Sequence, residues 1–329
     1  MMLSGVLNVY KEAGFTSHDV VAKMRGILQI KKIGHTGTLD PDAVGVLPVC
    51  VGNATKLCDM LGDETKEYVA LLKLGVSTDT QDMSGTVLKD TSECVSLLQD
   101  KDIENAIMSF KGEYDQIPPM YSALKVNGQK LYDLARKGIE VERKSRRVTI
   151  SELEILKGED NDIFTDRDNN LIKIRVVCSK GTYIRTLCND IGEKLGVGGA
   201  MEHLTRTRVG NFKIEDALKL EEIEKLVKIP GEDKLRNYDS LHNVIIPVDR
   251  VFSDYPALHV AQNGMKALIN GNQLQPETLA EVNDNNKFML TARRVYRIYS
   301  YDNQFYGLYE YHSGWNVLKS VKMFLPEKS

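Results

Sequence analysis

The sequence has few cysteines, little excess charge of either sign and no long apolar run. Its five cysteines are odd in number, widely spaced and never arranged as CxxC, which argues against a disulfide framework or a structural zinc site. The N-terminal residues lack a basic start followed by an apolar run, so we expect no signal peptide. The longest apolar stretches, such as residues 44–51, are too short to cross a bilayer. These absences predict a soluble protein of a reducing cytoplasm, with no membrane contact.

The balance of 43 Lys and Arg against 46 Asp and Glu gives a net charge of −3, which does not exclude a nucleic-acid ligand. The clustering of basic residues matters more than their sum. Residues 121–150 hold eight basic and three acidic side chains, whereas 90–104 and 159–168 are acidic. Tyr132 lies inside the basic stretch and Tyr121 at its edge. This pattern fits either a solvated face or a surface that follows an RNA backbone.

The chain of 329 residues, 42% of them hydrophobic, is long enough for two globular domains. After Arg250 the sequence contains short, aromatic, strand-like segments. This change predicts domains at 1–250 and 251–329, the second small and β-rich. Apolar spacing and a Thr16–Asp19 capping box predict a helix over 17–28. Similar patterns predict the following further elements: strands over 67–75, 148–156, 172–178, 295–301 and 305–311, and helices over 128–137, 182–195 and 260–269.

The densest motif is the glycine-rich segment 34–45, in which Asp40 precedes Pro41. The proline holds Asp40 in an extended conformation, and glycines allow a ligand to approach the backbone closely. A carboxylate fixed in this way can act as a nucleophile, a base or a metal ligand, although an Asx-turn on a surface loop explains the same residues. The segment matches neither GxxxxGK[ST] nor GxGxxG, so the usual nucleotide-binding loops are not supported.

Three other residues have a structural and a functional interpretation. Tyr68 at a strand start is typical of core packing. Arg185, in the first turn of a helix, fits a surface position or a bidentate clamp on a carboxylate or phosphate. His35 has no HxxH or HxE partner, so metal binding is not expected, and a local hydrogen bond is the simpler role.

Together these motifs resemble the bacterial TruB family of tRNA pseudouridine synthases over nearly the whole chain. The segment Gly34 to Pro41 is similar to the family's G-H-T-G-x-L-D-P loop. Four further blocks follow in the family's order: Tyr68 with Thr78 to Asp82, Gln116 to Lys125 with Leu131 to Gly138, Cys178 to Arg185, and Leu204 to Thr207 with Gly210 to Phe212.

The resemblance implies an α+β pseudouridine-synthase fold, a mixed and largely antiparallel sheet flanked by helices, with a PUA-like RNA-binding domain at 251–329. It implies an isomerase that converts uridine to pseudouridine at position 55, in the TΨC loop of tRNA, after the base flips out of the stack. It implies no cofactor and no catalytic metal. The implied partner is the TΨC arm of tRNA without a guide RNA, and we expect a monomer.

By resemblance, Asp40 is the catalytic nucleophile or base, and Arg185 pairs with it and keeps it ionised. Tyr68 belongs to the same catalytic set: it stacks on the base and could help remove the C5 proton. Stacking is the favoured role, since an ordinary Tyr pKa near ~10 makes it a poor base. His35 fills the place of the flipped uridine, and Leu204 is an apolar wall of the pocket. Lys11 supports the site or meets phosphate, and the other residues assigned to substrate binding are Tyr183, Lys125 and Arg136.

Three questions stay open at the level of sequence. Asp40 can attack C1′ of the ribose or remove a proton from C2′. A non-catalytic tRNA-binding or tRNA-folding protein could use the same scaffold, and guide-RNA-dependent relatives exist. We also expect the segments around Arg185 and Arg206 to add positive charge to the RNA-facing surface.

Overall fold

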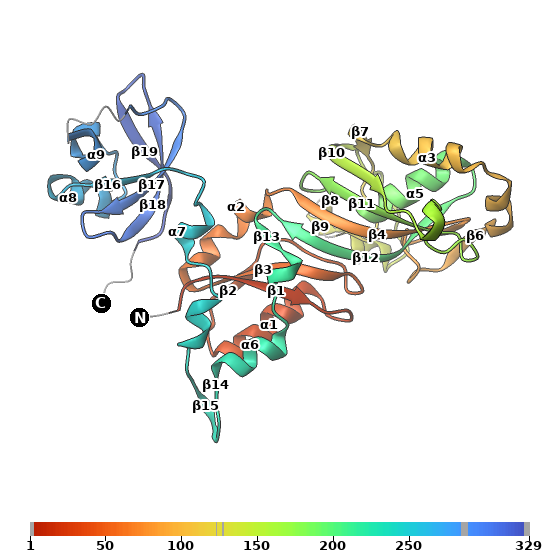
Figure 1. The fold of residues 1–329 in the computed structure, drawn as a ribbon, viewed down its shortest axis with the longest axis horizontal. Coiled ribbons are helices and arrows are strands. Elements are labelled where there is room, and N and C mark those ends of the chain that lie inside the picture. Colours follow the sequence, from red (N-terminus) through yellow and green to blue (C-terminus); the bar gives the residue numbers. More distant parts are fainter. Residues whose placement is uncertain (1–2, 123, 127, 284–288, 326–329) are drawn as a thin grey trace.

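The computed structural model describes residues 3–122, 124–126, 128–283 and 289–325. One large sheet crosses the molecule, and the C-terminal part forms a second, smaller sheet at one end of the molecule (Figure 1). The predicted domain ranges 1–250 and 251–329 include residues 1–2 and 326–329, which lie outside the described residues. No helix in the described part of the chain is long and apolar enough to cross a membrane.

The large sheet has nine strands, and its path runs β1-β3-β12-β4-β11-β10-β7. Along this path every described pairing is antiparallel except β3 with β12. The short strands β2 and β13 pair with β3 and β12. The strand bounds are Gly5–Lys11 (β1), Ile33–His35 (β2), Val44–Val51 (β3), Lys66–Leu74 (β4), Gly112–Gln116 (β7), Arg146–Ile155 (β10), Leu171–Cys178 (β11), Gly199–Val209 (β12) and Phe212–Lys213 (β13). The predicted mixed, largely antiparallel sheet is confirmed.

Two helix pairs cover the sheet, and strand alternation determines where they pack. On β4, Tyr68, Ala70, Leu72 and Leu74 are buried in a core that also contains apolar residues of α3 (Asp100–Met108) and α5 (Ile184–Leu195). At the other end, α1 (Ser17–Leu28) and α6 (Leu220–Val227) pack together with β1 and β3. The Thr16–Asp19 capping box that predicted α1 is present. The sheet therefore brings β3, β4 and the start of α5 to a common region.

Shorter helices and strands lie outside the large sheet and the four helices that cover it. The predicted helix over 128–137 is only α4, which ends before Gly138, a residue with a positive φ of 69°. The bounds are Cys58–Gly62 (α2), Val76–Thr78 (β5), Val87–Asp90 (β6), Lys125–Val126 (β8), Gln129–Lys130 (β9), Leu131–Ala135 (α4), Lys228–Ile229 (β14), Glu232–Arg236 (β15) and Val248–Val251 (α7).

The C-terminal sheet has the order β16-β17-β18-β19 and its own apolar core. The predicted helix over 260–269 is wrong in its first half, because Val260 ends β16, which pairs in parallel with β17. The predictions of strands over 295–301 and 305–311 are confirmed by β17 and β18. The bounds are Ala257–Val260 (β16), Met265–Ile269 (α8), Ala280–Asn283 (α9), Val295–Ser300 (β17), Phe305–His312 (β18) and Val317–Met323 (β19).

Gly45, on β3, combines a positive φ with the close approach of a neighbouring strand. Its φ is +107°, and a Cβ there would lie 2.2 Å from the carbonyl oxygen of Arg206 on β12. Gly112 has nearly the same φ, +106°, with nothing within 4 Å of its Cβ position. We expect Gly112→Ala to cost about 1–2 kcal/mol through backbone strain alone. Gly45→Ala should cost about 1–3 kcal/mol more, because the backbone of β12 must move. Urea unfolding measures both, and equal losses of unfolding free energy would contradict this packing.

Candidate active site

Asp40 lies in the turn between β2 and β3, at the surface of the core. Its neighbour Leu39 is buried, and the backbone N–H of Ala43 donates to the carbonyl of Asp40 at 3.2 Å. The Asp40 side chain itself is 39% exposed. The glycine-rich segment thus anchors itself through Leu39 and leaves the Asp40 carboxylate within reach of a ligand.

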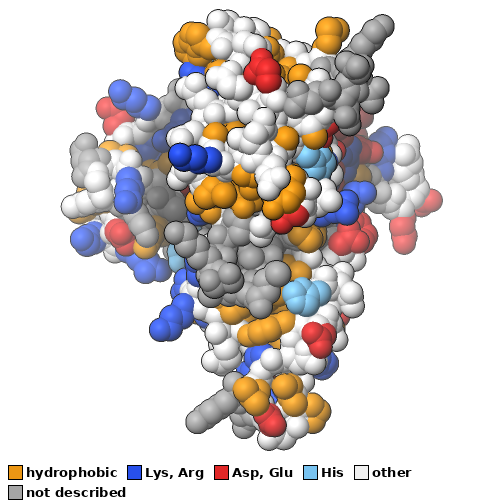
Figure 2. Space-filling model, turned by 90° about the vertical axis from the view of Figure 1, so that its left-hand side faces the viewer, with side chains coloured by type: hydrophobic (Ala, Val, Ile, Leu, Met, Phe, Trp, Pro, Cys, Tyr) orange, Lys and Arg blue, Asp and Glu red, His pale blue; other side chains and the backbone are white. Residues whose placement is uncertain are grey.

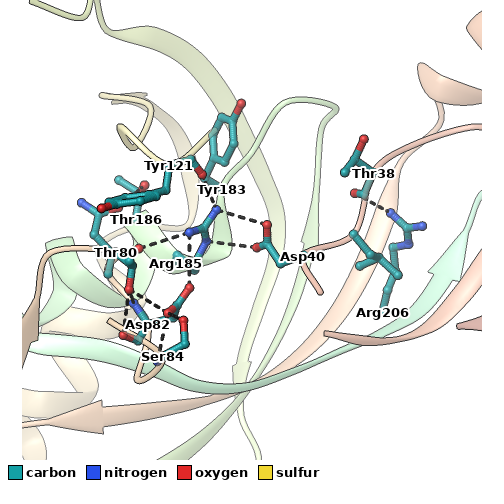
Figure 3. A network of polar contacts seen from close by, with 12 residues as sticks. Thr38, Asp40, Thr80, Asp82, Ser84, Tyr121, Tyr183, Arg185, Thr186 and Arg206 are labelled. Atoms are coloured by element: carbon teal, nitrogen blue, oxygen red, sulfur yellow. Dashed lines mark hydrogen bonds and ion pairs between the residues drawn. The ribbon is translucent and has the colours of Figure 1, made fainter. Parts of the chain in front are cut away.

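Arg185 holds this carboxylate from the first turn of α5. Its Nε lies 3.0 Å from Asp40 Oδ2, and its Nη2 donates to Oδ1 at 3.2 Å, a bidentate pair (Figure 3). The Arg185 side chain is only 6% exposed, so the surface interpretation of this residue is wrong. The predicted pairing of Arg185 with Asp40 is present. A planar guanidinium bound through two nitrogens fixes the orientation of the carboxylate as well as its position.

The opposite side of Arg185 contacts a second carboxylate, Asp82, which our sequence analysis did not assign. Arg185 Nη1 lies 3.3 Å from Asp82 Oδ2 and donates to the carbonyl of Thr80 at 3.2 Å, while Nη2 also donates to the carbonyl of Tyr121 at 2.8 Å. Asp82 is itself held by Thr80 Oγ1 at 2.7 Å. Figure 3 shows Arg185 between the Asp82 turn and Asp40. The sequence signal for Asp82 was its place in the polar block Thr78 to Asp82. A surface turn explains those residues without a partner for the carboxylate.

The pKa of Asp40 depends on burial and on neighbouring charges. The surrounding protein removes water from the carboxylate and raises its pKa above the ordinary value, Asp82 raises it further, and the charge of Arg185 lowers it. Turnover that needs the ionised form should therefore fall on the acid side at a higher pH than for an ordinary aspartate.

Tyr68, on β4, is buried beside Leu39 and Leu204 in one core cluster. Burial raises the pKa of Tyr68 above its ordinary value, although the charge of Arg206 opposes the shift. A phenol with a raised pKa stays protonated at neutral pH, which favours packing or stacking over proton removal.

Arg206 is fully buried, which corrects our expectation that it adds charge to an RNA-facing surface. Its Nε donates to the carbonyl of Val46 at 2.7 Å, and its Nη atoms donate to the carbonyls of Thr38 and Gly37, each at 3.4 Å. Arg206 therefore fastens both ends of the Asp40 loop from β12. The residue type gave no sign of this role, because arginine is mostly exposed in proteins.

Lys11, at the end of β1, is also buried, and its ammonium lies beneath the same loop. Its Nζ donates to the carbonyls of Pro41 at 2.8 Å, Ala43 at 2.6 Å and Glu12 at 3.2 Å. These contacts favour the supporting role over contact with phosphate. Burial lowers the pKa of Lys11 to about 8.

The lowered pKa of Lys11 predicts an alkaline limit to activity. As the pH rises through about 8, the ammonium loses a proton and one of its donors to the loop carbonyls. We expect the single-turnover rate to decline above this pH. Lys11→Met should be slower throughout and lack this limb, whereas Lys32→Met, at an exposed lysine, should keep it. Rates measured between about pH 7 and pH 9.5 test this, and an unchanged limb in Lys11→Met would contradict it.

The remaining predicted residues lie at different distances from this centre. Tyr183 precedes α5, and its N–H donates to Gln116 Oε1 at 2.8 Å, next to Arg185 in Figure 3. His35 ends β2, with its ring edge-on to His18 at 5.1 Å, and burial lowers its pKa, so the imidazole is neutral at pH 7. Leu204 lies in the core cluster of Tyr68, as an apolar pocket wall would.

Lys125 and Arg136 lie apart from the carboxylate, in the basic stretch. They line a hollow of about 570 Å³ with Gly128, Gln129, Asp133 and Lys137, and Arg136 lies over the ring of Tyr132. Tyr121, whose carbonyl contacts Arg185, begins the same stretch. The chain thus connects the basic stretch to the site. Within the described ranges, no group of three His, Cys, Asp or Glu side chains could hold a metal ion.

Solved structures share this architecture. A chain in the "Crystal Structure of a Cbf5-Nop10-Gar1 Complex" matches with a TM-score of 0.69 and 27% identity, covering 98% of this chain and 85% of that one. The "Structure of H/ACA RNP bound to a substrate RNA containing 2'-deoxyuridine" matches at 0.68 and 25%, covering 98% and 86%. With the mixed sheet and the Asp40–Arg185 pair, this likeness defines the chain as a protein of the pseudouridine-synthase fold.

Sequence comparisons narrow the class. Residues 25–184 match the model of the TruB family pseudouridylate synthase N-terminal domain, and residues 185–253 match the tRNA pseudouridylate synthase B C-terminal domain. A protein of Lachnoclostridium phytofermentans named tRNA pseudouridine synthase B is 49% identical, covering 98% of this chain and 100% of its own length. A protein of the same name from Clostridium tetani is 44% identical, covering 93% and 95%. The chain belongs to the TruB family.

Proposed function

We propose that this protein isomerises uridine to pseudouridine at position 55, in the TΨC loop of tRNA. The observation that carries the proposal is the partly exposed carboxylate of Asp40, held by two nitrogens of the buried Arg185. The names of the relatives, tRNA pseudouridine synthase B, supply the substrate class.

The reaction must break the N1–C1′ bond, turn the base and join C5 to C1′, after which the C5 proton leaves. Departure of the base makes C1′ electron-poor. Asp40 can attack C1′ and form an ester that the returning base displaces, or it can take a proton from C2′ and give it back later. Both routes need the carboxylate ionised and aimed at the sugar. The bidentate contact with Arg185 fixes the orientation of the carboxylate, and the charge of Arg185 favours the ionised form against the effect of burial.

The substrate base must leave the stack, at a cost of roughly a few kcal/mol. In this proposal, Tyr68 and Leu204 form the apolar side of the pocket, and the neutral His35 fills the vacated place. The pocket selects uridine, while Lys125 and Arg136 contact phosphates that position the arm. Tyr183, beside Arg185, borders the bound nucleotide.

The same proposal includes the cofactor requirement, the location and the oligomeric state of the enzyme. It works without a cofactor or a metal, as a cytoplasmic monomer, and its β-rich C-terminal part is a PUA-like RNA-binding domain. It uses no guide RNA. The sequence identities support this: they are 41–49% to the tRNA pseudouridine synthases but 25% to the chain from the H/ACA ribonucleoprotein. Light scattering on the purified protein tests the monomer.

The test is pseudouridine mapping on an unmodified tRNA transcript incubated with the protein alone. Product at position 55, without added RNA and in the presence of a chelator, is the expected result. A non-catalytic tRNA-binding or tRNA-folding protein would bind the transcript under single-turnover conditions and leave every uridine unchanged. A guide-dependent enzyme would act only after a guide RNA is added. Either outcome would overturn the proposal.

A further inference from the structure

The turn between β18 and β19 exposes the single tryptophan of the sequence, Trp315. Its side chain is 67% exposed, although burying a ring of this size would stabilise the fold. The turn residues beside it, Ser313, Gly314 and Asn316, are exposed and not apolar, so the turn that carries Trp315 is polar. An exposed indole on a polar turn is a surface on which a ring-shaped ligand can stack.

Neighbouring side chains hold this ring in place. The His312 ring lies over it at a centroid distance of 5.8 Å and an angle of 25°. Lys319 places its ammonium 3.4 Å from the ring centroid. Tyr311 Oη donates to Asn316 Oδ1 at 2.9 Å and fixes the turn. Because the ring is already ordered, a ligand that stacks on it loses little affinity to ordering the side chain.

Positive charge gathers at the same end of the C-terminal sheet. The N–H of Arg293 donates to the carbonyl of Tyr311 at 2.9 Å, and the N–H of Tyr311 donates to the carbonyl of Arg294 at 3.1 Å. Both arginines are exposed. One acid, Glu310, lies 3.5 Å from His312. Figure 2 shows the end of the molecule that carries the C-terminal part, where Lys and Arg as well as Asp and Glu side chains stand among hydrophobic ones.

We propose that Trp315, His312 and Lys319, with Arg293 and Arg294 beside them, form a stacking platform for an unpaired nucleobase of the RNA substrate. The base stacks on the part of the indole that His312 and Lys319 leave exposed, and the cations contact the adjoining phosphates. The polar turn disfavours a protein partner, which would need apolar surface around its anchor. This platform rests on the proposed function for its ligand, RNA, and it adds a contact far along the chain from Asp40.

Because Trp315 is the single tryptophan, its fluorescence reports on the platform in the full-length protein. We expect titration with an unmodified tRNA transcript to quench the emission in parallel with binding measured on the same samples. A fully double-stranded RNA should bind without quenching. Emission that stays unchanged while the transcript saturates the protein would overturn the proposal.

Variants separate stacking from a structural role. Trp315→Ala should weaken tRNA binding about five-fold or more, and Trp315→Phe should restore most of the affinity. Tyr301→Ala is the matched control, because Tyr301 is 59% exposed on the turn between β17 and β18, at the other end of the sheet. Its affinity should not change. If Trp315→Ala lowers only the melting temperature, Trp315 is a turn residue and the platform is wrong.

An isolated TΨC-arm hairpin distinguishes failure of the stacking platform from failure of the proposed function. The C-terminal sheet lies at the end of the molecule opposite α5, so we place the base bound by the platform outside the TΨC arm (Figure 1). Trp315→Ala should therefore form pseudouridine on the hairpin at the wild-type rate. A lower rate on the hairpin would contradict the platform. If the wild-type protein forms no pseudouridine but tRNA still quenches its emission, the proposed function fails and the platform stands.

Discussion

Asp40→Asn is expected to abolish pseudouridine formation and leave tRNA binding within a few-fold of the wild type. The amide cannot supply the negative charge that attacks C1′ or removes the C2′ proton, and loss of a nucleophile typically costs about 10⁴-fold or more in rate. The fold should persist, because Arg185 keeps Asp82 as a partner and the amide oxygen of the variant can still accept a hydrogen bond from Arg185. Single-turnover rates and filter binding measure the two effects.

The matched control is Asp42→Asn, two residues along the same loop. Asp42 is exposed, so its charge is lost from the same neighbourhood without touching Arg185. It should retain turnover close to that of the wild type. Near-normal turnover in Asp40→Asn, or an equal loss in both variants, would remove Asp40 from the central role.

Arg185→Lys is expected to lower the single-turnover rate roughly 100-fold, the scale seen when one positioned electrostatic group is lost. Lysine keeps the charge but cannot reach Asp40 with two nitrogens while contacting Asp82 and the carbonyls of Thr80 and Tyr121. Arg185 is the largest influence that lowers the pKa of Asp40, so a weaker contact should also move the acid limb of the pH profile upward.

Arg175→Lys separates this effect from a general loss of ion pairs. Arg175, on β11, contacts Glu67, Glu152 and Glu154 at 2.7–3.1 Å, none of which contacts Asp40. This control should lower stability somewhat and leave both the rate and the acid limb unchanged. An acid limb that does not move in Arg185→Lys would show that Arg185 does not set the ionisation of Asp40.

The part of the site that sequence could predict is the part carried by local motifs. Asp40 stood out because a proline and several glycines fix its backbone, and Arg185 stood out because it follows a strand-to-helix turn. The helix α1 was predictable because its capping box and apolar spacing are local signals. The contact between Asp40 and Arg185, across 145 positions of sequence, was reached through the family resemblance.

The buried cations that support the Asp40 loop, Arg206 and Lys11, could not be predicted. Their contacts are long-range, and arginine and lysine are ordinarily exposed. Arg206 reaches the loop carbonyls across 160 or more positions, and Lys11 reaches them across about 30. Only the pairing of β1 with β3 and of β3 with β12 brings these cations beneath the loop. The strand β16 was missed for a similar reason, since its parallel pairing with β17 joins residues 40 positions apart.

The most direct test follows the C5 proton, which uridine loses when it becomes pseudouridine. A tRNA transcript labelled with tritium at C5 of uridine 55 alone is mixed with excess protein, and the tritium released to solvent is counted. The proposed activity predicts one tritium released per tRNA by the wild type, and none by Asp40→Asn although it binds the transcript. Binding by the wild type without release would contradict it.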